Sequence, residues 1–331
     1  MYRYIYFILI LLFFSACSQT VTIRALEPAQ VDGVSETKKI AVLNFRNDRV
    51  GLARKIEADL AHFKINNKKY FTIVSRNDFD TIIKEQKLQS SGLVDEDSSV
   101  KVGELIGAEA IISGDVRSPT KQDSYFYEQR VRCANTKCSK LTYYNVRCMK
   151  RVVGLAAEIR VVDVSRGDII YADTLNRQQA FQHCIDDSRA LPSTSMAAQN
   201  LAQRIANDFA YKLTPHYRVF SVTLLEDPDL DYTSQQEKLL KVSLEYIKQN
   251  RYDKAQQFLM RLIDSTGSKS YVPFYDLGVI KEAEGKYKEA KEYYEQADNL
   301  MVEPVDEINE AVVRINALIA KREKTMEQLN R

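Results

Sequence analysis

The sequence predicts two domains of different fold class: an α/β (α+β) sheet-and-helix domain, followed by an all-α domain of helical repeats. Three observations predict this. Short apolar segments alternate with amphipathic ones up to about residue 120, long extended segments follow, and a motif recurs 35 residues apart near the C-terminus. The chain of 331 residues is long enough for two cores. Its net charge is only +2, with Lys and Arg dispersed among Asp and Glu, which gives no indication of nucleic-acid binding.

The first residues are typical of an export signal. Residues 5–14 form an apolar run that is too short to span a bilayer as a mature helix, and small residues precede Cys17. This arrangement resembles the lipobox of bacterial lipoproteins. The resemblance implies that residues 1–16 are a lipoprotein signal peptide, that Cys17 is acylated, and, because Ser18 rather than Asp follows, that the protein is anchored to outer-membrane lipid on the periplasmic face. A secreted protein with a chance cysteine is the alternative.

Residues 17–38 are expected to form a tether, and the first domain follows over residues 39–224. Its elements alternate between apolar strands and amphipathic helices, the first helix having a possible N-cap at Asn47–Asp48. The expected order is a strand over 39–45, a helix over 50–63, a strand over 70–74, a helix over 78–87, a short helix ending at Gly107 and a strand over 110–116. This order indicates helices packed on a sheet.

From residue 124 the pattern changes to long extended segments. Residues 125–133 and 141–149 flank a polar tip and predict a β-hairpin. Later elements are a strand over 155–164, its return over 169–175, a helix capped by Ser193 with Met196, Leu201, Ile205 and Phe209 on its inner face, and a strand over 217–224. Residues 225–234, rich in Asp, are expected to be a linker.

Four cysteines remain besides Cys17, and an even number in an oxidising periplasm predicts two disulfides. In the predicted hairpin Cys133 and Cys138 lie opposite each other, close enough for a bridge. Cys148 and Cys184 are then left on flanking segments of the same sheet. The other pairings stay open, as does a zinc site, because Cys133 and Cys138 have a loose ligand spacing and a histidine precedes Cys184.

The remainder, residues 235–331, is predicted to be helical and repetitive. A Tyr, an Ala three residues later and an aromatic three beyond occur twice, 35 residues apart. This pattern resembles the tetratricopeptide repeat, in which the small Ala lets two helices approach and the aromatics fill the groove between them. The expected packing residues are Tyr252, Ala255, Phe258, Gly278, Tyr287, Ala290 and Tyr293. A helix over 305–328 is expected to cap the repeats, and an unrelated helical bundle is the alternative.

Five segments of the first domain, taken in order, resemble the CsgG family, the lipoproteins of curli secretion and their relatives. They are residues 39–42, 71–76, 85–92, 105–114 and 160–169. The resemblance implies a membrane-tethered periplasmic α/β domain that tends to form rings, and so a homo-oligomer.

No catalytic motif accompanies this resemblance. The sequence has neither a Walker-type loop nor a Gly-rich dinucleotide fingerprint, and its three histidines have no hydrolase arrangement around them. We therefore expect no enzyme activity, no cofactor and no metal. The functional hypothesis is an outer-membrane-anchored oligomeric scaffold, for assembly or secretion of an envelope or cell-surface structure, that binds an envelope protein through its repeats.

Two other functions stay open. One is a subunit of a curli-type secretion channel, whose two membrane-inserted hairpins would correspond here to residues 118–153 and 174–192. Charged residues interrupt the apolar face of the first segment and the second is polar, which disfavours insertion. The other is a lipoprotein activator of a peptidoglycan synthase, as some small related lipoproteins are.

Overall fold

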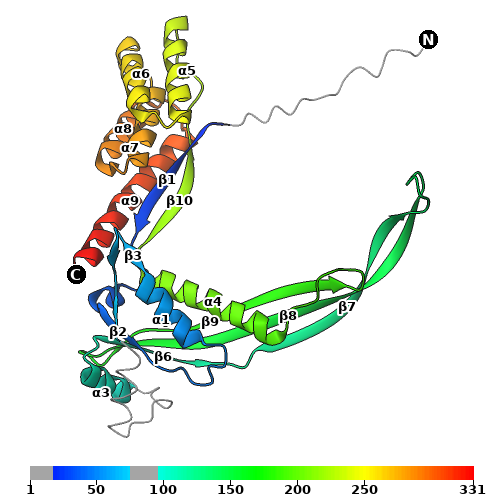
Figure 1. The fold of residues 1–331 in the computed structure, drawn as a ribbon. Coiled ribbons are helices and arrows are strands. Elements are labelled where there is room, and N and C mark those ends of the chain that lie inside the picture. Colours follow the sequence, from blue (N-terminus) through cyan, green and yellow to red (C-terminus); the bar gives the residue numbers. More distant parts are fainter. Residues whose placement is uncertain (1–17, 75–95) are drawn as a thin grey trace. The chain divides into compact units, whose positions relative to one another are not determined.

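The structure, a computed structural model, describes residues 18–74 and 96–331 and divides them into two compact units. The sheet unit comprises Pro28–His216 with Thr325–Arg331, and the helical unit comprises residues 18–27 with Tyr217–Lys324. Figure 1 labels most elements of both units. The predicted fold class, a sheet with helices followed by an all-helical region, is confirmed.

The sheet unit is built on six strands in the order β5-β2-β6-β8-β7, with β9 paired to β8 as well. β2 is parallel to β5 and β6, whereas β8 runs antiparallel to β6, β7 and β9. The bounds are β2 Lys39–Val42, β5 Thr72–Ile73, β6 Ala110–Val116, β7 Thr120–Cys133, β8 Leu141–Asp163 and β9 Ile169–Cys184. β8 is therefore the strand on which the sheet is organised.

β8 is longer than the sequence predicted. Two strands were expected, over 141–149 and 155–164, but β8 continues through all 23 residues. Its N-terminal part pairs with β7 and its C-terminal part with β6, while β9 pairs with its middle and C-terminal parts. The charged residues Lys150 and Arg151 do not interrupt the strand, because β7 and β9 hold it from both sides.

Two helices, α1 Leu52–His62 and α4 Thr194–Leu213, lie on the same face of the sheet (Figure 1). Alternate residues of β8, from Val153 to Val161, are buried in the core shared with these helices. Ser193 caps α4 as predicted, its Oγ accepting from Met196 N at 3.1 Å. The N-cap residue of α1 is Gly51 and not Asn47 or Asp48, although Asp48 Oδ1 accepts from Leu52 N at 2.9 Å. Met196 is 57% exposed, however, so its predicted place on the inner face of α4 is wrong.

A third helix, α3 Glu96–Ile106, contributes Val102 to a smaller apolar cluster with Ala41, Leu43 and Ile111. It ends before Gly107, whose φ of 62° is the left-handed conformation that glycine favours at a helix C-terminus. The predicted helix over 78–87 and the family segment 85–92 lie outside the described residues.

The helical unit contains two helix pairs followed by a long helix. The bounds are α5 Ser234–Lys248, α6 Tyr252–Ser265, α7 Val272–Ala283, α8 Tyr287–Leu300 and α9 Asp306–Asn330, of which residues up to Lys324 belong to this unit. Thr233 and Gln236 form a capping box at the start of α5, with side chains satisfying each other's backbone N–H groups. The expected helix over 305–328 corresponds to α9.

A strand occupies part of the segment expected to be a tether. β1, Thr20–Glu27, pairs with β10, His216–Thr223. Val21, Ile23 and Ala25 alternate into the apolar core of the helical unit. The tether expected over 17–38 is therefore wrong for these residues, since the burial of every second side chain outweighs the polar residues around them. A 3-10 turn, η1 Asp32–Glu36, follows in the sheet unit.

Candidate functional site

The outer parts of β7, β8 and β9 form an arm that extends beyond α4 (Figure 1). Its apolar interior is small, with Val146, Cys148 and Cys184 buried and Phe126 and Tyr144 packed against them. No described helix contributes to this cluster. Local cross-links and ion pairs therefore carry a larger share of the arm's stability than they do near α1 and α4.

Both disulfides lie in the arm. Cys133 is bridged to Cys138 at the hairpin tip, and Cys148 to Cys184, which face each other in the register of β8 and β9. These are the two expected pairs, the first expected from the hairpin geometry and the second because Cys148 and Cys184 were the cysteines left over. Glu128 Oε2 lies 3.4 Å from Cys184 Sγ, but a disulfide sulfur is not the thiolate ligand that zinc requires, so the bridged state does not fit the zinc alternative.

Ion pairs connect the arm's strands. Arg151 donates to both carboxylate oxygens of Asp123 at 2.8 and 2.9 Å, joining β8 to β7. These hydrogen bonds lower the pKa of Asp123 to about 2. Arg130 contacts Asp186 and Asp187 at 3.1 and 3.0 Å, which ties β7 to the segment after β9.

One face of the arm exposes aromatic and aliphatic side chains. Tyr125, Tyr127 and Tyr143 are 62, 72 and 63% exposed, and Leu141 lies near them on β8. Arg147 lies over the Tyr125 ring, 4.6 Å from its centroid. Between Thr120 and Lys150, Lys and Arg outnumber Asp and Glu by seven to two. The arm therefore presents both aromatic rings and positive charge.

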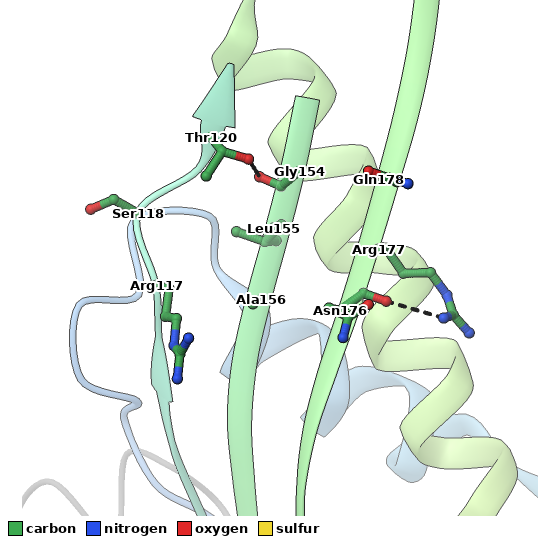
Figure 2. A pocket seen from close by; sticks show the side chains of 9 residues that line it. All are labelled: Arg117, Ser118, Thr120, Gly154, Leu155, Ala156, Asn176, Arg177 and Gln178. Atoms are coloured by element: carbon green, nitrogen blue, oxygen red, sulfur yellow. Dashed lines mark hydrogen bonds between the residues drawn. The ribbon is translucent and has the colours of Figure 1, made fainter. Parts of the chain in front are cut away.

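A polar groove of about 560 Å³ crosses the sheet where β6 gives way to β7 (Figure 2). Its lining residues are Arg117, Ser118, Thr120, Gly154, Leu155, Ala156, Asn176, Arg177 and Gln178. Figure 2 shows Arg117 and Arg177 on either side of the β8 segment. None of these lining residues is acidic, and their hydroxyl, amide and guanidinium groups suit a polar or anionic ligand group.

The β8 residues that line the bottom of this groove include the small residues Gly154 and Ala156. A Cβ on Gly154 would meet Thr120 Oγ1 at 2.6 Å, so a larger residue would require the Thr120 side chain or its strand to shift. Arg177 Nη2 pairs with Asp208 of α4 at 2.7 Å, which leaves that guanidinium partly neutralised. The groove thus offers a polar contact surface without a reactive group.

The residues predicted to pack the repeats lie in the helical unit, some of them buried between helices and others only half-buried. Ala255 and Ala290 are fully buried between helices, and Tyr287 is buried beside them. Phe258 and Tyr293 are only half-buried, as is Tyr252. Phe258 stacks on Tyr246 of α5, while Tyr293 directs its hydroxyl to Met260 Sδ of α6 at 4.0 Å. The half-buried aromatics therefore form the outer rim of the helix contact.

The aromatic that lies fully buried on the Ala290 face of α8 is Tyr294, one residue later than predicted. The helix face that contains Ala290 continues four residues on, not three, and Tyr294 is fully buried. Its ring occupies the space beside Gly278, where a Cβ would meet Tyr294 Cδ1 at 2.5 Å. Tyr293 packs against the same core from its rim and does not fill this space, whereas the glycine lies where the repeat needs it.

A buried ion pair in the same repeat was not predicted. Glu282 on α7 accepts from Arg314 of α9 at 2.9 and 3.0 Å and from the Tyr294 hydroxyl at 2.5 Å. Glu282 is 1% exposed, so these three donors replace its hydration. Because the partners are separated by 32 residues, no local pattern reveals the pair.

Cys17 lies outside the described residues, so its acylation stays a prediction. Among the helices of the described ranges, none is both long and apolar enough to cross a membrane.

Residues 29–183 match the family model of CsgG, the curli production assembly/transport component, and residues 273–300 match that of a tetratricopeptide repeat. Both resemblances are confirmed. The chain thus contains a CsgG-like region within the sheet unit and a tetratricopeptide repeat in the helical unit. No curated protein matches the chain.

Several solved structures are similar to part of it. The C-terminal domain of LpoB from Salmonella enterica is 15% identical, covering 46% of this chain and 96% of its own, with a TM-score of 0.27. The hypothetical protein CT253 from Chlamydia trachomatis is 12% identical, with coverages of 53% and 97% and a TM-score of 0.26. A PelC dodecamer from Paraburkholderia phytofirmans is 14% identical, with coverages of 59% and 98% and a TM-score of 0.24.

Proposed function

We propose that the protein is a non-enzymatic, outer-membrane-anchored periplasmic scaffold lipoprotein that acts in assembly or secretion of an envelope structure. Its sheet unit self-associates, and its helical unit binds an envelope protein. The observation that carries this proposal is the joining, in one chain, of a region similar to an assembly/transport component with a tetratricopeptide repeat. The first is typical of envelope assembly, and the second of protein–protein contact.

Self-association is supported by the edges of the sheet. Among the described strands, β7 and β9 each pair with β8 alone, which leaves 14 and 16 residues with one unpaired edge. Open edges of this length are available for pairing with another chain. Sedimentation velocity of the detergent-extracted protein measures this directly, and a monomer at all concentrations would contradict it.

Partner binding must use a surface other than the α7 side of the repeats. The extended segment β1 packs there, and Tyr275 of α7 donates to Thr223 O next to it at 2.8 Å. The exposed side of α6 and α8 remains, where Met260 is 50% exposed beside the half-buried Tyr293. An amphipathic partner segment fits such an apolar spot with a polar rim.

The experiment compares affinity capture from envelopes by the wild type, Met260→Lys and the control Val313→Lys. Val313 is 73% exposed on α9 of the same unit, so both variants add one charge at an exposed apolar site. We expect Met260→Lys to lose a protein that the wild type and the control retain. Equal recovery in all three would reject this surface.

Anchoring is tested separately. Cys17→Ser removes the acylation site and with it every acyl chain that the site would carry. Because stable anchoring depends on such chains, we expect the variant to leave washed membranes. Full retention of the variant in membranes would show that Cys17 is not the anchor.

A secretion-channel subunit is the second candidate, and the exposed tyrosines of the arm favour it. Arg147 lies on that same face beside Tyr125, which makes contact with lipid costly. Reproducible single-channel steps in planar bilayers would support the channel and reject the scaffold as the whole function.

A further inference from the structure

A basic cavity lies in the sheet unit and shares no lining residue with the groove of Figure 2. Its volume is about 450 Å³, and its ionisable lining residues are Lys38, Lys68, Lys69, Tyr70 and Arg331. Four of these are cations, and none of the lining residues is acidic. The cavity thus gathers positive charge in a space of the size that holds small ligands.

Three segments that are distant in sequence build this cavity. β3, Lys64–Ile65, and β4, Lys68–Lys69, form a hairpin through Asn66–Asn67, whose φ values of 49° and 63° suit a tight two-residue turn. Lys38 precedes β2, and Arg331 follows α9. The lysines of β4 are therefore held by a defined turn.

Lys38 has a structural role in addition to its charge. Its Nζ lies 3.8 Å from the centroid of the Tyr70 ring and donates to Gln328 O, in the last turn of α9, at 3.0 Å. Burial, together with the charge of Arg331, lowers the pKa of Lys38 to about 8. Burial, the larger cause, disfavours a charge of either sign, whereas the smaller contribution of Arg331 is a positive field that favours an anion.

The other cations differ in how far they are neutralised. Arg331 pairs with Glu327 at 2.6 Å and lies within 3.6 Å of Asp32 and Glu36. Lys68 and Lys69 form no ion pair within residues 18–74 and 96–331. Lys38 has a structural role at the end of α9, and Arg331 is paired with nearby carboxylates. Neither kind of interaction explains why Lys68 and Lys69 of β4 line the cavity.

Tyr70, one of the lining residues, has a buried hydroxyl that pairs with no group of the described residues. Tyr70 is 7% exposed, and its hydroxyl makes no hydrogen bond within the part of the chain that the structure describes. Buried hydroxyls in folded proteins normally have a partner, so the Tyr70 hydroxyl has a donor capacity that the described part of the chain leaves unused.

We propose that this cavity binds a phosphate group, carried by a lipid headgroup or by a soluble phosphate compound. Lysines act as point charges around phosphate oxygens, and several of them around one small space suit a group with more than one oxygen to offer. Ile65, Met326 and Leu329 also line the cavity and accommodate an apolar remainder of the ligand.

Calorimetric titration of the full-length protein tests the site with three probes: inorganic pyrophosphate, dihexanoyl-phosphatidylglycerol and dihexanoyl-phosphatidylcholine. Short acyl chains keep the lipids monomeric, so the protein's own anchor does not interfere. We expect the Lys68→Ser/Lys69→Ser variant to weaken binding about tenfold or more. The control Lys64→Ser/Lys101→Ser removes the same charge from exposed positions outside the cavity and should change it less than about twofold.

Binding of pyrophosphate alone identifies a soluble phosphate compound, and binding of phosphatidylglycerol alone identifies a lipid headgroup. No binding of either probe, equal binding of phosphatidylcholine, or equal loss in both double variants overturns the proposal. Reductive methylation gives a second readout, because an amine with the lowered pKa of Lys38 reacts readily near neutral pH. Pyrophosphate should protect Lys38 and leave Lys101 unprotected, and equal rates at Lys38 with and without it would also reject the site.

Discussion

The sheet is stabilised in different ways at its base and in its arm. At the base, α1 and α4 cover the strands, and residues such as Ile159, Leu201 and Phe209 are fully buried. In the arm, three residues are buried in a cluster to which no described helix contributes, and the strands are joined by disulfides and by ion pairs such as Arg151–Asp123. Where helices do not cover the sheet, disulfides and ion pairs therefore provide part of the stability that apolar burial provides elsewhere.

The helical unit, like the base of the sheet, is stabilised by buried apolar side chains. Of the changes considered, overpacking this core should therefore cause the largest loss of stability. Ala290 is fully buried between helices, and Ala290→Arg would force a long charged side chain into that contact. We expect a loss on the order of 5 kcal/mol in the free energy of unfolding of this unit, from steric strain and an unpaired buried charge. Limited proteolysis should show cleavage after Ser234 while the arm stays intact. Unchanged resistance would mean that these helices are not packed around Ala290.

Breaking the buried ion pair should have the next largest effect. Arg314→Met leaves the Glu282 carboxylate buried without its cation, which costs about 3–5 kcal/mol. Chemical denaturation of the helical unit measures this loss. The double variant Glu282→Leu/Arg314→Met removes both charges and should recover most of the stability, and a double variant no more stable than the single one would contradict a charge-based explanation.

The disulfides should matter in the arm and not at the base. Cys148→Ala/Cys184→Ala opens a link across 36 residues, and we expect a local loss of about 2–4 kcal/mol. Cys133→Ala/Cys138→Ala opens a link across only 5 residues and should cost less, because a short loop loses less entropy on closure. Hydrogen exchange resolved by peptide distinguishes the arm from the base. Equal protection in both variants and the wild type would show that the arm does not depend on its cross-links.

The arm and the helical unit should respond to acid in opposite directions. The pKa of Asp123 is lowered from 3.8 to about 2 by Arg151, so its stabilising contribution is present above pH 4 and is lost as the pH falls from about 4 to about 2. Burial raises the pKa of Asp276 on α7 well above its usual range, against the hydrogen bond from Leu225 N. The folded helical unit therefore binds a proton that the unfolded chain releases, and Asp276 makes this unit more stable as the pH falls through that raised pKa.

Hydrogen exchange measured from neutral pH down to about pH 2 should show α7 becoming better protected as Asp276 binds its proton, and the arm opening below about pH 4 as Asp123 binds its own. Asp276→Asn should abolish the first response and Asp123→Asn the second. A common response of both regions, unaltered by either variant, would contradict the assignment of these two carboxyl groups.

Much of this organisation could be predicted from the sequence where the signal is local. Strand and helix order followed from apolar periodicity, and the Cys133–Cys138 pair followed from a hairpin with its tip between them. β1 was missed because the short alternation of Val21, Ile23 and Ala25 lies among polar residues, and its burial depends on helices more than 200 residues away.

Long-range features of the candidate sites could not be predicted for the same reason. Tyr294 rather than Tyr293 fills the space beside Gly278, because the face of α8 is set by packing against α7. The basic cavity combines Lys38, β4 and Arg331, which adjoin only when the sheet unit folds. No pattern within one segment shows that these cations meet.

The most direct test of the two-part scaffold is the native mass of the intact protein extracted from outer membranes in mild detergent, measured for the wild type and for Ala290→Arg. We predict that both sediment as the same homo-oligomer and that a partner protein co-sediments with the wild type alone. A monomeric wild type, or an oligomer that dissociates when the repeats are disrupted, would contradict it.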